Sequence, residues 1–323
     1  MEAIFLNEYE TVCEKGAGFF EQKRGLIEVS GGEAEMFLNG LVTNDVKKLP
    51  ENSWMLAAFP NAQGRLLGVV RIWREEGKFY FDTENATYET VLRNLKRFTL
   101  AGDFFVNDLT EEFTCYAVHG RNIPNFKFQI PKLENQILEA EFNGEKITIL
   151  NDANVGENGF YFYVPEKQAE SFKEEMQNSD VIQISEETFE VLRIEAGLPL
   201  YGVDMDETTV VLETGLDDAV NFNKGCYIGQ EIIARIHFRG HVAKKLTGLI
   251  LEDETAEIEP NDELKSSDGK NAGRITSVTY SPKLKKTIAL AYVRYDYLAE
   301  GTRLKVNDYM ALVKDLPFSE QLG

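Results

Sequence analysis

The chain has 323 residues, more than a single hydrophobic core usually holds, so its length predicts two or three domains. Its 54 acidic side chains outnumber its 34 Lys and Arg side chains, and the formal net charge of −20 argues against sequence-independent binding to nucleic acid or to anionic membranes. Three widely spaced cysteines predict no disulfide framework. Because the sequence shows neither a basic leader nor a run of about 18 apolar residues, we expect a cytoplasmic protein.

The first half of the sequence predicts alternating helices and strands. The first fifty residues indicate a helix, a strand at 25–29 and a second helix, with Ser30 as its N-cap and Glu33 completing a capping box. Turn sequences then separate three expected strands, and a helix should cover them; these elements are 54–59, 65–73, 78–81 and 85–98.

The pattern of predicted secondary structure in the second half of the sequence changes after Gly240. Before it, further strands are expected at 103–107, 113–118, 145–150 and 159–164, and helices are expected after Pro165 and over 185–196. Beyond Gly240, short β-rich runs alternate with polar turns and no helix intervenes; these runs are 245–251, 273–280, 287–293 and 303–306. The pattern predicts a separate small barrel or sandwich.

One cysteine stands in a setting that suits a reactive thiol. Cys226 lies in the run KGCYIGQE, which extends from Lys224 to Glu231. Lys224 and the positive end of a following helix would both favour the thiolate. The alternative is a buried, inert cysteine, and spacing alone leaves both interpretations open. Cys13 and Cys115 lie in apolar periodic stretches and are expected in the core.

The segment around this cysteine is locally basic in an acidic chain. Between residues 219 and 246 the single acid is Glu231, and it is opposed by Lys224, Arg235, Arg239, Lys244 and Lys245. If residues 230–239 form a helix, Glu231, Arg235 and Arg239 share one face. This face is either an anion site or a solvated, salt-bridged surface.

The three histidines indicate no metal site. His237 and His241 are four residues apart, but Gly240 interrupts the helix between them and no third ligand is nearby in sequence. His119 follows an apolar strand and is expected to be structural.

Four segments together resemble a known family. KGCYIGQE, followed by Arg235 and by FRG at 238–240, resembles the signature of the YgfZ-type folate-binding proteins, which belong to the superfamily of the glycine-cleavage T-protein, an aminomethyltransferase. LNGLVTNDV at 38–46, NAQGR at 61–65 and RIEAGLPLYG at 193–202 resemble the wider superfamily. The resemblance implies an α+β fold: an intertwined two-domain body and a C-terminal all-β barrel in a ring around a folate pocket. The implied domains are 1–46 with 112–240, which carries the cysteine segment, the inserted 47–111, and the barrel at 241–323.

The resemblance also implies a cofactor, tetrahydrofolate or a one-carbon derivative, and roles for particular residues. Glu195 would accept hydrogen bonds from the pteridine edge, and Cys226 with Lys224 would form the catalytic pair. The other implied cofactor-binding residues are Tyr201 and Tyr227, which would stack on the rings, and Lys224, Arg235 and Arg239, which would bind the anionic tail.

The function implied by the resemblance is support of the assembly or repair of iron–sulfur enzymes, including tRNA-modifying ones. The expected partners are folate and iron–sulfur proteins or their assembly factors, with no direct contact to nucleic acid or membrane, and the chain is expected to be a monomer. Two alternatives stay open: a folate-dependent aminomethyltransferase and a non-catalytic, folate-sensing adaptor. If the chain is catalytic, we expect a folate-dependent one-carbon transferase. The transferases carry an aspartate shortly after the turn at 61–64, where this chain has GRLLG at 64–68.

Overall fold

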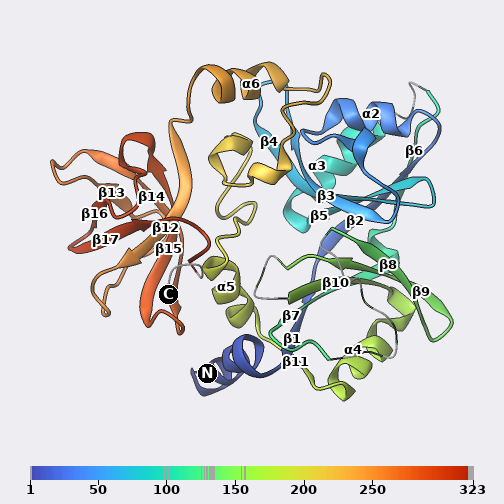
Figure 1. Ribbon diagram of the computed structural model, residues 1–323, viewed down its shortest axis with the longest axis horizontal. Helices are drawn as coiled ribbons and strands as arrows, with labels where there is room; N and C mark the ends of the chain where they lie inside the picture. Colours follow the sequence, from blue (N-terminus) through green and yellow to red (C-terminus); the bar gives the residue numbers. More distant parts are fainter. Residues whose placement is uncertain are drawn as a thin grey trace. The chain divides into compact units, whose positions relative to one another are not determined.

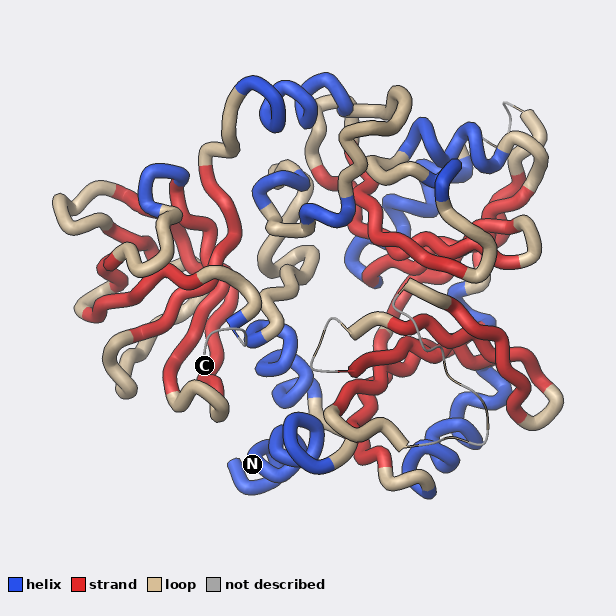
Figure 2. Tube along the Cα trace, in the orientation of Figure 1, coloured by secondary structure: helices blue, strands red, loops and turns tan. Residues whose placement is uncertain are grey.

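The computed structural model describes residues 2–97, 99, 102–124, 126, 128, 130, 135–153, 155 and 158–318. The chain forms two compact units. Figures 1 and 2 show its helices and strands. The first unit comprises Met1–Ala62, Leu66–Thr188 and Asp218–Gln230, and the second comprises Gln63–Arg65, Phe189–Asp217 and Glu231–Gly323. The expected mixed body of helices and sheets, with a C-terminal closed β-barrel, is confirmed.

The first unit contains a six-stranded sheet in the order β11-β1-β7-β10-β9-β8. β1 and β11 pair in parallel, and the other neighbours pair antiparallel. An aromatic core fills one face, where Phe162 of β10 and Tyr116 of β7 pack against Phe172 of helix α4. The strands are β1 (Ala17–Gln22), β7 (Phe113–Gly120), β8 (Ile137–Phe142), β9 (Glu145–Asn151), β10 (Asn158–Pro165) and β11 (Val181–Gln183), and the helices beside them are α1 (Glu2–Glu10) and α4 (Ala169–Asn178).

A five-stranded antiparallel sheet, in the order β3-β4-β5-β2-β6, completes the first unit. Leu38 and Leu41 of α2, with Val91 and Leu95 of α3, share one buried core with the strands. The elements are β2 (Arg24–Ser30), α2 (Ala34–Leu41), β3 (Ser53–Pro60), β4 (Leu66–Glu75), β5 (Lys78–Glu84), α3 (Asn85–Lys96) and β6 (Phe105–Asp108). Because β2 pairs with β5, the predicted boundary between residues 46 and 47 runs through one sheet; the division of the body into domains stays a prediction.

Buried charges connect the two sheets of the first unit. The guanidinium of Arg71 in β4 donates to Asp82 of β5 at 2.7 Å and to Asp152, just after β9, at 2.9 Å. It also lies over the ring of Tyr161 in β10, 3.8 Å from the ring centroid. Arg24 of β2 pairs with the other oxygen of Asp82 at 2.5 Å. Each buried charge therefore has an opposite partner, without which burial would be costly.

The second unit is built on a closed barrel of six antiparallel strands in the order β12-β15-β14-β13-β16-β17. An apolar interior, including Leu249, Ile275 and Val313, fills it. The strands are β12 (Lys244–Leu251), β13 (Glu263–Lys265), β14 (Asn271–Ser281), β15 (Lys286–Arg294), β16 (Arg303–Val306) and β17 (Tyr309–Lys314). Most of α5 (Glu186–Glu195) and of α6 (Gln230–Arg239) belongs to this unit.

Most predicted elements are present, and the predicted capping box is wrong. Helix α2 begins at Ala34, with Glu33 rather than Ser30 at its N-cap. The carboxylate of Glu33 accepts a hydrogen bond from the backbone N–H of Asp103, and the N–H of Glu33 donates to the carbonyl of Asp103. Glu33 is thus held by the loop before β6 and does not cap its own helix.

Within the part of the chain that the structure describes, no helix is long and apolar enough to span a membrane.

His119 of β7 is buried, as expected for a structural residue, and burial lowers the pKa of this imidazole to about 3. The folded protein then keeps His119 neutral while the unfolded chain protonates it near pH 6.5. The neutral imidazole of His119 therefore makes its full contribution to the free energy of unfolding above about pH 6.5, and this contribution is lost as the pH falls towards 3.

We therefore expect the free energy of unfolding to fall more steeply below pH 6.5 in the wild type than in a His119→Gln variant, by up to about 1.4 kcal/mol per pH unit. Urea unfolding curves between pH 7 and pH 4 measure the difference. If the free energy of unfolding depended on pH equally in the two proteins, His119 would have to be protonated in the folded state as well.

Candidate functional site

Lys224 joins two segments of the first unit that lie far apart in sequence. Its ammonium group donates to the carbonyl oxygens of Asn39 at 2.8 Å, Val42 at 2.8 Å and Asn44 at 2.5 Å. These carbonyls lie at and just beyond the C-terminal end of α2, where backbone acceptors lack helical partners and a positive charge is favourable. The side chain is buried, and its three N–H bonds are all used. We call this arrangement the Lys224 clamp.

Backbone and side-chain hydrogen bonds reinforce the Lys224 clamp. The N–H of Ile228 donates to the carbonyl of Gly40 at 3.0 Å, which satisfies another acceptor of the last turn of α2. The hydroxyl of Thr43 donates to the carbonyl of Ala219 at 2.6 Å. The side-chain amide of Asn44 donates to the backbone carbonyl of Asp218 at 2.9 Å. Two segments recognised separately in the sequence, 38–46 and 224–231, therefore form one site.

The Lys224 clamp changes the role predicted for this lysine. Burial lowers the pKa of Lys224 to about 8, while the nearby Asp45 opposes that shift. Because every N–H of the ammonium is bonded to a carbonyl, Lys224 has no hydrogen bond left to donate to a ligand or to the sulfur of Cys226. Its demonstrated contacts are structural, and its predicted catalytic and tail-binding roles stay predictions.

Cys226 is exposed to solvent, whereas Cys115 is buried and Cys13 is intermediate. The helix that follows the cysteine, α6, begins at Gln230, four residues after Cys226. The sulfur therefore lies in a loop rather than at a helix N-terminus. The interpretation of Cys226 as a buried, inert residue does not hold for the structure.

Tyr227, predicted to stack on a ligand ring, is buried beside the clamp. Its ring centroid lies 5.1 Å from the ammonium of Lys224, a cation–π geometry, and burial raises the pKa of its hydroxyl to about 12. Of the predicted site residues, the structure places Lys224, Cys226 and Tyr227 together in one short segment of the first unit.

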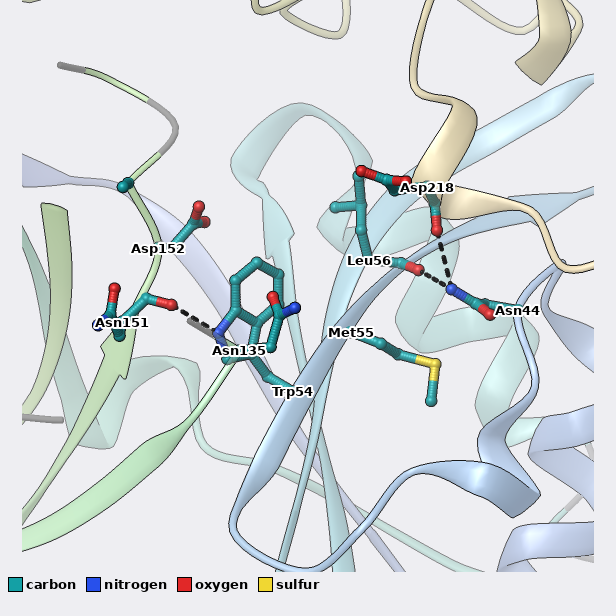
Figure 3. A pocket seen from close by; sticks show the side chains of 9 residues that line it. Asn44, Trp54, Met55, Leu56, Asn135, Asn151, Asp152 and Asp218 are labelled. Carbon is teal, nitrogen blue, oxygen red and sulfur yellow. Dashed lines mark hydrogen bonds between the residues drawn. The ribbon is translucent and has the colours of Figure 1, made fainter. Parts of the chain in front are cut away.

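A pocket of about 470 Å³ adjoins the clamped segment (Figure 3). The amide of Asn44 forms part of its wall and is fixed by donating to the carbonyls of Leu56 at 2.8 Å and Asp218 at 2.9 Å. The indole of Trp54 donates to the carbonyl of Asn151 at 2.9 Å. The pocket is lined by Asn44, Trp54, Met55, Leu56, Asn135, Asn151, Asp152, Ala153 and Asp218. A second pocket of about 490 Å³ shares Asn44, Trp54, Met55 and Asn135 with it.

Sequence reasoning missed this pocket. Its walls come from five separated stretches of the first unit, and only the motif around Asn44 pointed to any of them. Among the residues that the structure describes, no three His, Cys, Asp or Glu side chains are grouped as metal ligands would be.

The other predicted site residues belong to the second unit. Glu195, the last residue of α5, is buried, and its Oε1 accepts a hydrogen bond from the hydroxyl of Ser281 in β14. Tyr201 is partly exposed and forms an isolated bridge with Met205. Arg235 and Arg239 are exposed on α6, and neither forms an ion pair with a residue in the described ranges. The expected helix over 230–239 is confirmed. Its arginines form no salt-bridged face with the described residues.

The segment at 193–202 has a clear structural role in the second unit. Arg193 donates to Asp204 at 2.7 Å and to the hydroxyl of Ser277 at 3.0 Å. Asp204 in turn accepts hydrogen bonds from Thr276 at 2.5 Å and from Ser277 at 2.7 Å. This buried network fixes α5 against strand β14.

Comparison with known proteins decides the family. Residues 1–224 match the GCVT N-terminal domain, and residues 244–318 match the glycine cleavage T-protein C-terminal barrel domain. The chain belongs to the glycine cleavage T-protein family. Its finer resemblance to the YgfZ type stays a proposal.

Relatives of this T-protein family member carry the name aminomethyltransferase. One from Rubrobacter xylanophilus is 30% identical over 293 residues, which cover 88% of this chain and 78% of the relative. Another, from Thermoanaerobacter pseudethanolicus, is 27% identical over 322 residues and covers 93% of this chain and 84% of the relative. The crystal structure of glycine cleavage system aminomethyltransferase T from Bartonella henselae has the same fold, with a TM-score of 0.88, 23% identity, and coverage of 98% of this chain and 90% of that chain.

The Lys224 clamp predicts the effect of a Lys224→Met substitution. Three buried carbonyls would lose a charged donor, so we expect the free energy of unfolding to fall by about 1.5–3 kcal/mol or more in urea titrations. Lys245→Met is a matched control, because Lys245 forms an exposed ion pair with Asp217 at 3.3 Å and should cost less than about 1 kcal/mol. Equal stability of the two variants would contradict a structural role for the clamp.

Exposure predicts the order in which the cysteines react. We expect iodoacetamide at neutral pH to label Cys226 first, and Cys115 only after unfolding, because Cys115 is buried and burial raises the pKa of its thiol to about 12. Peptide mapping after limited labelling measures the order. A Cys226 that stays unlabelled in the native protein would show that the loop shields the sulfur.

Proposed function

We propose that this T-protein family member binds tetrahydrofolate or a one-carbon derivative of it. The observation that carries the proposal is that both T-protein domains are present, at 1–224 and 244–318, and that the motif segments of the first domain meet at the Lys224 clamp. The residues proposed to contact the folate are those that the resemblance assigns and that are not engaged by the clamp, namely Glu195, Tyr201, Tyr227, Arg235 and Arg239. Lys224, whose N–H bonds all go to backbone carbonyls, would act by holding the loop in place.

The first candidate activity is folate-dependent aminomethyl transfer. The names of the relatives support this activity more directly than they support a role with iron–sulfur enzymes. In such a reaction the protein would hold the folate and the aminomethyl donor together. A nitrogen of the folate and the carbon of the aminomethyl group would then meet within one complex.

The second candidate is a YgfZ-type role, in which the protein supports assembly or repair of iron–sulfur enzymes, including tRNA-modifying ones, through Cys226. Two observations favour it over aminomethyl transfer. Cys226 is the exposed cysteine of the chain and lies in the clamped loop. Where the transferases carry an aspartate after the turn, this chain has no acid between residues 64 and 68.

The packing around Gly68 explains how firmly that acid is excluded. Gly68 lies in β4, and a Cβ atom there would be 3.1 Å from both Thr87 Cβ and Val91 Cγ2 of α3. A side chain at this position would push these two side chains away by a few tenths of an ångström. The close packing of Gly68 against the side chains of α3 thus disfavours a carboxylate there.

The two candidates differ in a transfer assay. With an aminomethylated lipoyl carrier and tetrahydrofolate, we expect turnover to be about 10²–10⁴-fold lower than that of a T-protein that carries the aspartate, because acid–base assistance from that group is missing. Turnover equal to that of such a T-protein would establish aminomethyl transfer as the activity and remove the second candidate.

The second candidate has its own test. In a strain that lacks its YgfZ-type protein, the wild-type chain should restore the activity of iron–sulfur enzymes, and Cys226→Ala should not. Cys115→Ala is the matched control, since that thiol is buried. Full rescue by Cys226→Ala would favour the folate-sensing adaptor, in which the cysteine has no chemical role.

A further inference from the structure

Glu75, the last residue of β4, is a buried acid at the contact between the two sheets of the first unit. Only 2% of its surface is exposed, although the turn that follows it is exposed. Its Oε2 accepts a hydrogen bond from the indole Nε1 of Trp73 at 3.3 Å. Its Oε1 lies 2.9 Å from the ammonium of Lys146 in β9. The carboxyl group thus reaches from the five-stranded sheet to the six-stranded one.

A second carboxyl group meets Glu75 at this contact. The side chain of Glu139, in β8, forms a hydrogen bond with that of Glu75 and lies 2.6 Å from the same ammonium of Lys146. Two ionised carboxylates have no donor between them, so a hydrogen bond between them requires one proton. Burial raises the pKa of Glu75 to about 7, and the hydrogen bond from Glu75 lowers the pKa of Glu139. The proton therefore belongs on Glu75, as donor to ionised Glu139.

The neighbours of Glu75 on β5 are occupied with another acid. Lys78, the cross-strand neighbour of Glu75, forms an ion pair with Glu28 at 2.8 Å. Tyr80 stacks on Trp73, with ring centroids 5.2 Å apart, and its hydroxyl also donates to Glu28 at 3.2 Å. These groups form one side of the surroundings of Glu75 and direct their polar atoms to Glu28.

Lys146 supplies positive charge to the contact. Among the described residues its ammonium faces three carboxyl groups, those of Glu75, Glu139 and the largely exposed Glu76, which lies 3.7 Å away. With the proton in place, the charges of Glu75, Glu139 and Lys146 sum to zero. Without it, two carboxylates lie side by side, one of them buried, so the contact carries both repulsion and the cost of burying a charge.

Backbone hydrogen bonds attach the start of β8 to β3 without any titratable group. The N–H of Ile137 donates to the carbonyl of Asn52 at 3.0 Å, and the N–H of Trp54 donates to the carbonyl of Asn135 at 2.9 Å. A change in pH therefore acts on the contact between Glu75 and Glu139 and leaves this attachment in place.

We propose that Glu75 and Glu139 share one proton and form a pH-sensitive contact between the two sheets of the first unit. Below neutral pH the shared proton holds the β8–β9 hairpin against β4. Above neutral pH the proton passes to solvent through Glu139, whose side chain is 38% exposed, and repulsion between the two carboxylates loosens the hairpin. This response to pH is separate from the proposed folate binding.

The direction of the effect on stability follows from proton linkage. The pKa of Glu75 is higher in the folded protein than its ordinary value of 4.5, so the folded protein holds a proton that the unfolded chain releases. The stabilisation from this proton is full below about pH 4.5 and is lost as the pH rises through 7.

Trp73 can report the shared proton, because its indole is bonded to the carboxyl group of Glu75. The test titrates the intrinsic fluorescence of the full chain, without ligand, and the wild type should show a transition with a midpoint near pH 7. Glu75→Gln should abolish this transition. Glu139→Gln should lower the midpoint by about one pH unit, because the neighbouring negative charge is removed. Glu76→Gln is the matched control, since it removes a carboxylate near the same lysine, and it should titrate as the wild type does.

Hydrogen exchange measures the loosening itself. After correction for the intrinsic effect of pH on exchange, peptides from β8 and β9 should exchange about tenfold faster above the transition than below it in the wild type, and equally on both sides of it in Glu75→Gln. Circular dichroism identifies the variants that fold. Glu139→Gln changes a partly exposed side chain and decides the question if Glu75→Gln does not fold.

Several results would overturn the proposal. A wild type without a fluorescence transition near pH 7, a transition that persists in Glu75→Gln, or equal midpoints in Glu139→Gln and Glu76→Gln would each show that no proton is shared. Equal exchange of the β8–β9 hairpin on both sides of the transition in the wild type would show that the proton does not hold the sheets together.

Discussion

The candidate site depends on one buried ammonium group. Lys224 donates to three carbonyls at the end of α2, across a sequence separation of 180 to 185 residues. A lysine is suited to this position because its three N–H bonds can meet three acceptors, and because the end of a helix attracts positive charge. These hydrogen bonds fix the position of the loop that contains Cys226 and Tyr227. They also fix the segment that contains Asn44, which lines the pocket.

A second buried network gives that pocket its electrostatic character. Arg71 compensates Asp82 and Asp152 and stacks on Tyr161, so the charges between the two sheets balance. The lining of the pocket is left with the charge of Asp218.

The local elements could be predicted from the sequence, but the long-range contacts could not. The helix at Gln230–Arg239 and the meander of β3 to β5 follow from apolar spacing and turn residues, and the structure reproduces both. The sequence does not predict strands β13 and β17: β13 has three residues, and the Asn307–Asp308 turn before β17 lacks the glycine typical of such hairpins, although Asn307 adopts a positive φ of 51°. Lys224 was expected beside the sulfur because charge and sequence proximity are visible in the sequence, whereas its partners on α2 are not. The pocket escaped prediction for the same reason, since its walls come from separated stretches whose side chains have no shared pattern.

The central claim is that the Lys224 clamp assembles a folate-binding unit from two remote segments. The most direct measurement is the tetrahydrofolate affinity of Lys224→Met, taken by isothermal titration at a temperature where the variant is folded, beside Lys245→Met, which loses the same charge. The account predicts that Lys224→Met binds tetrahydrofolate at least about tenfold more weakly than the wild type, because a displaced loop would lose the equivalent of about one charged hydrogen bond to the ligand. Lys245→Met should bind as the wild type does. A folded Lys224→Met that binds tetrahydrofolate with wild-type affinity would contradict it.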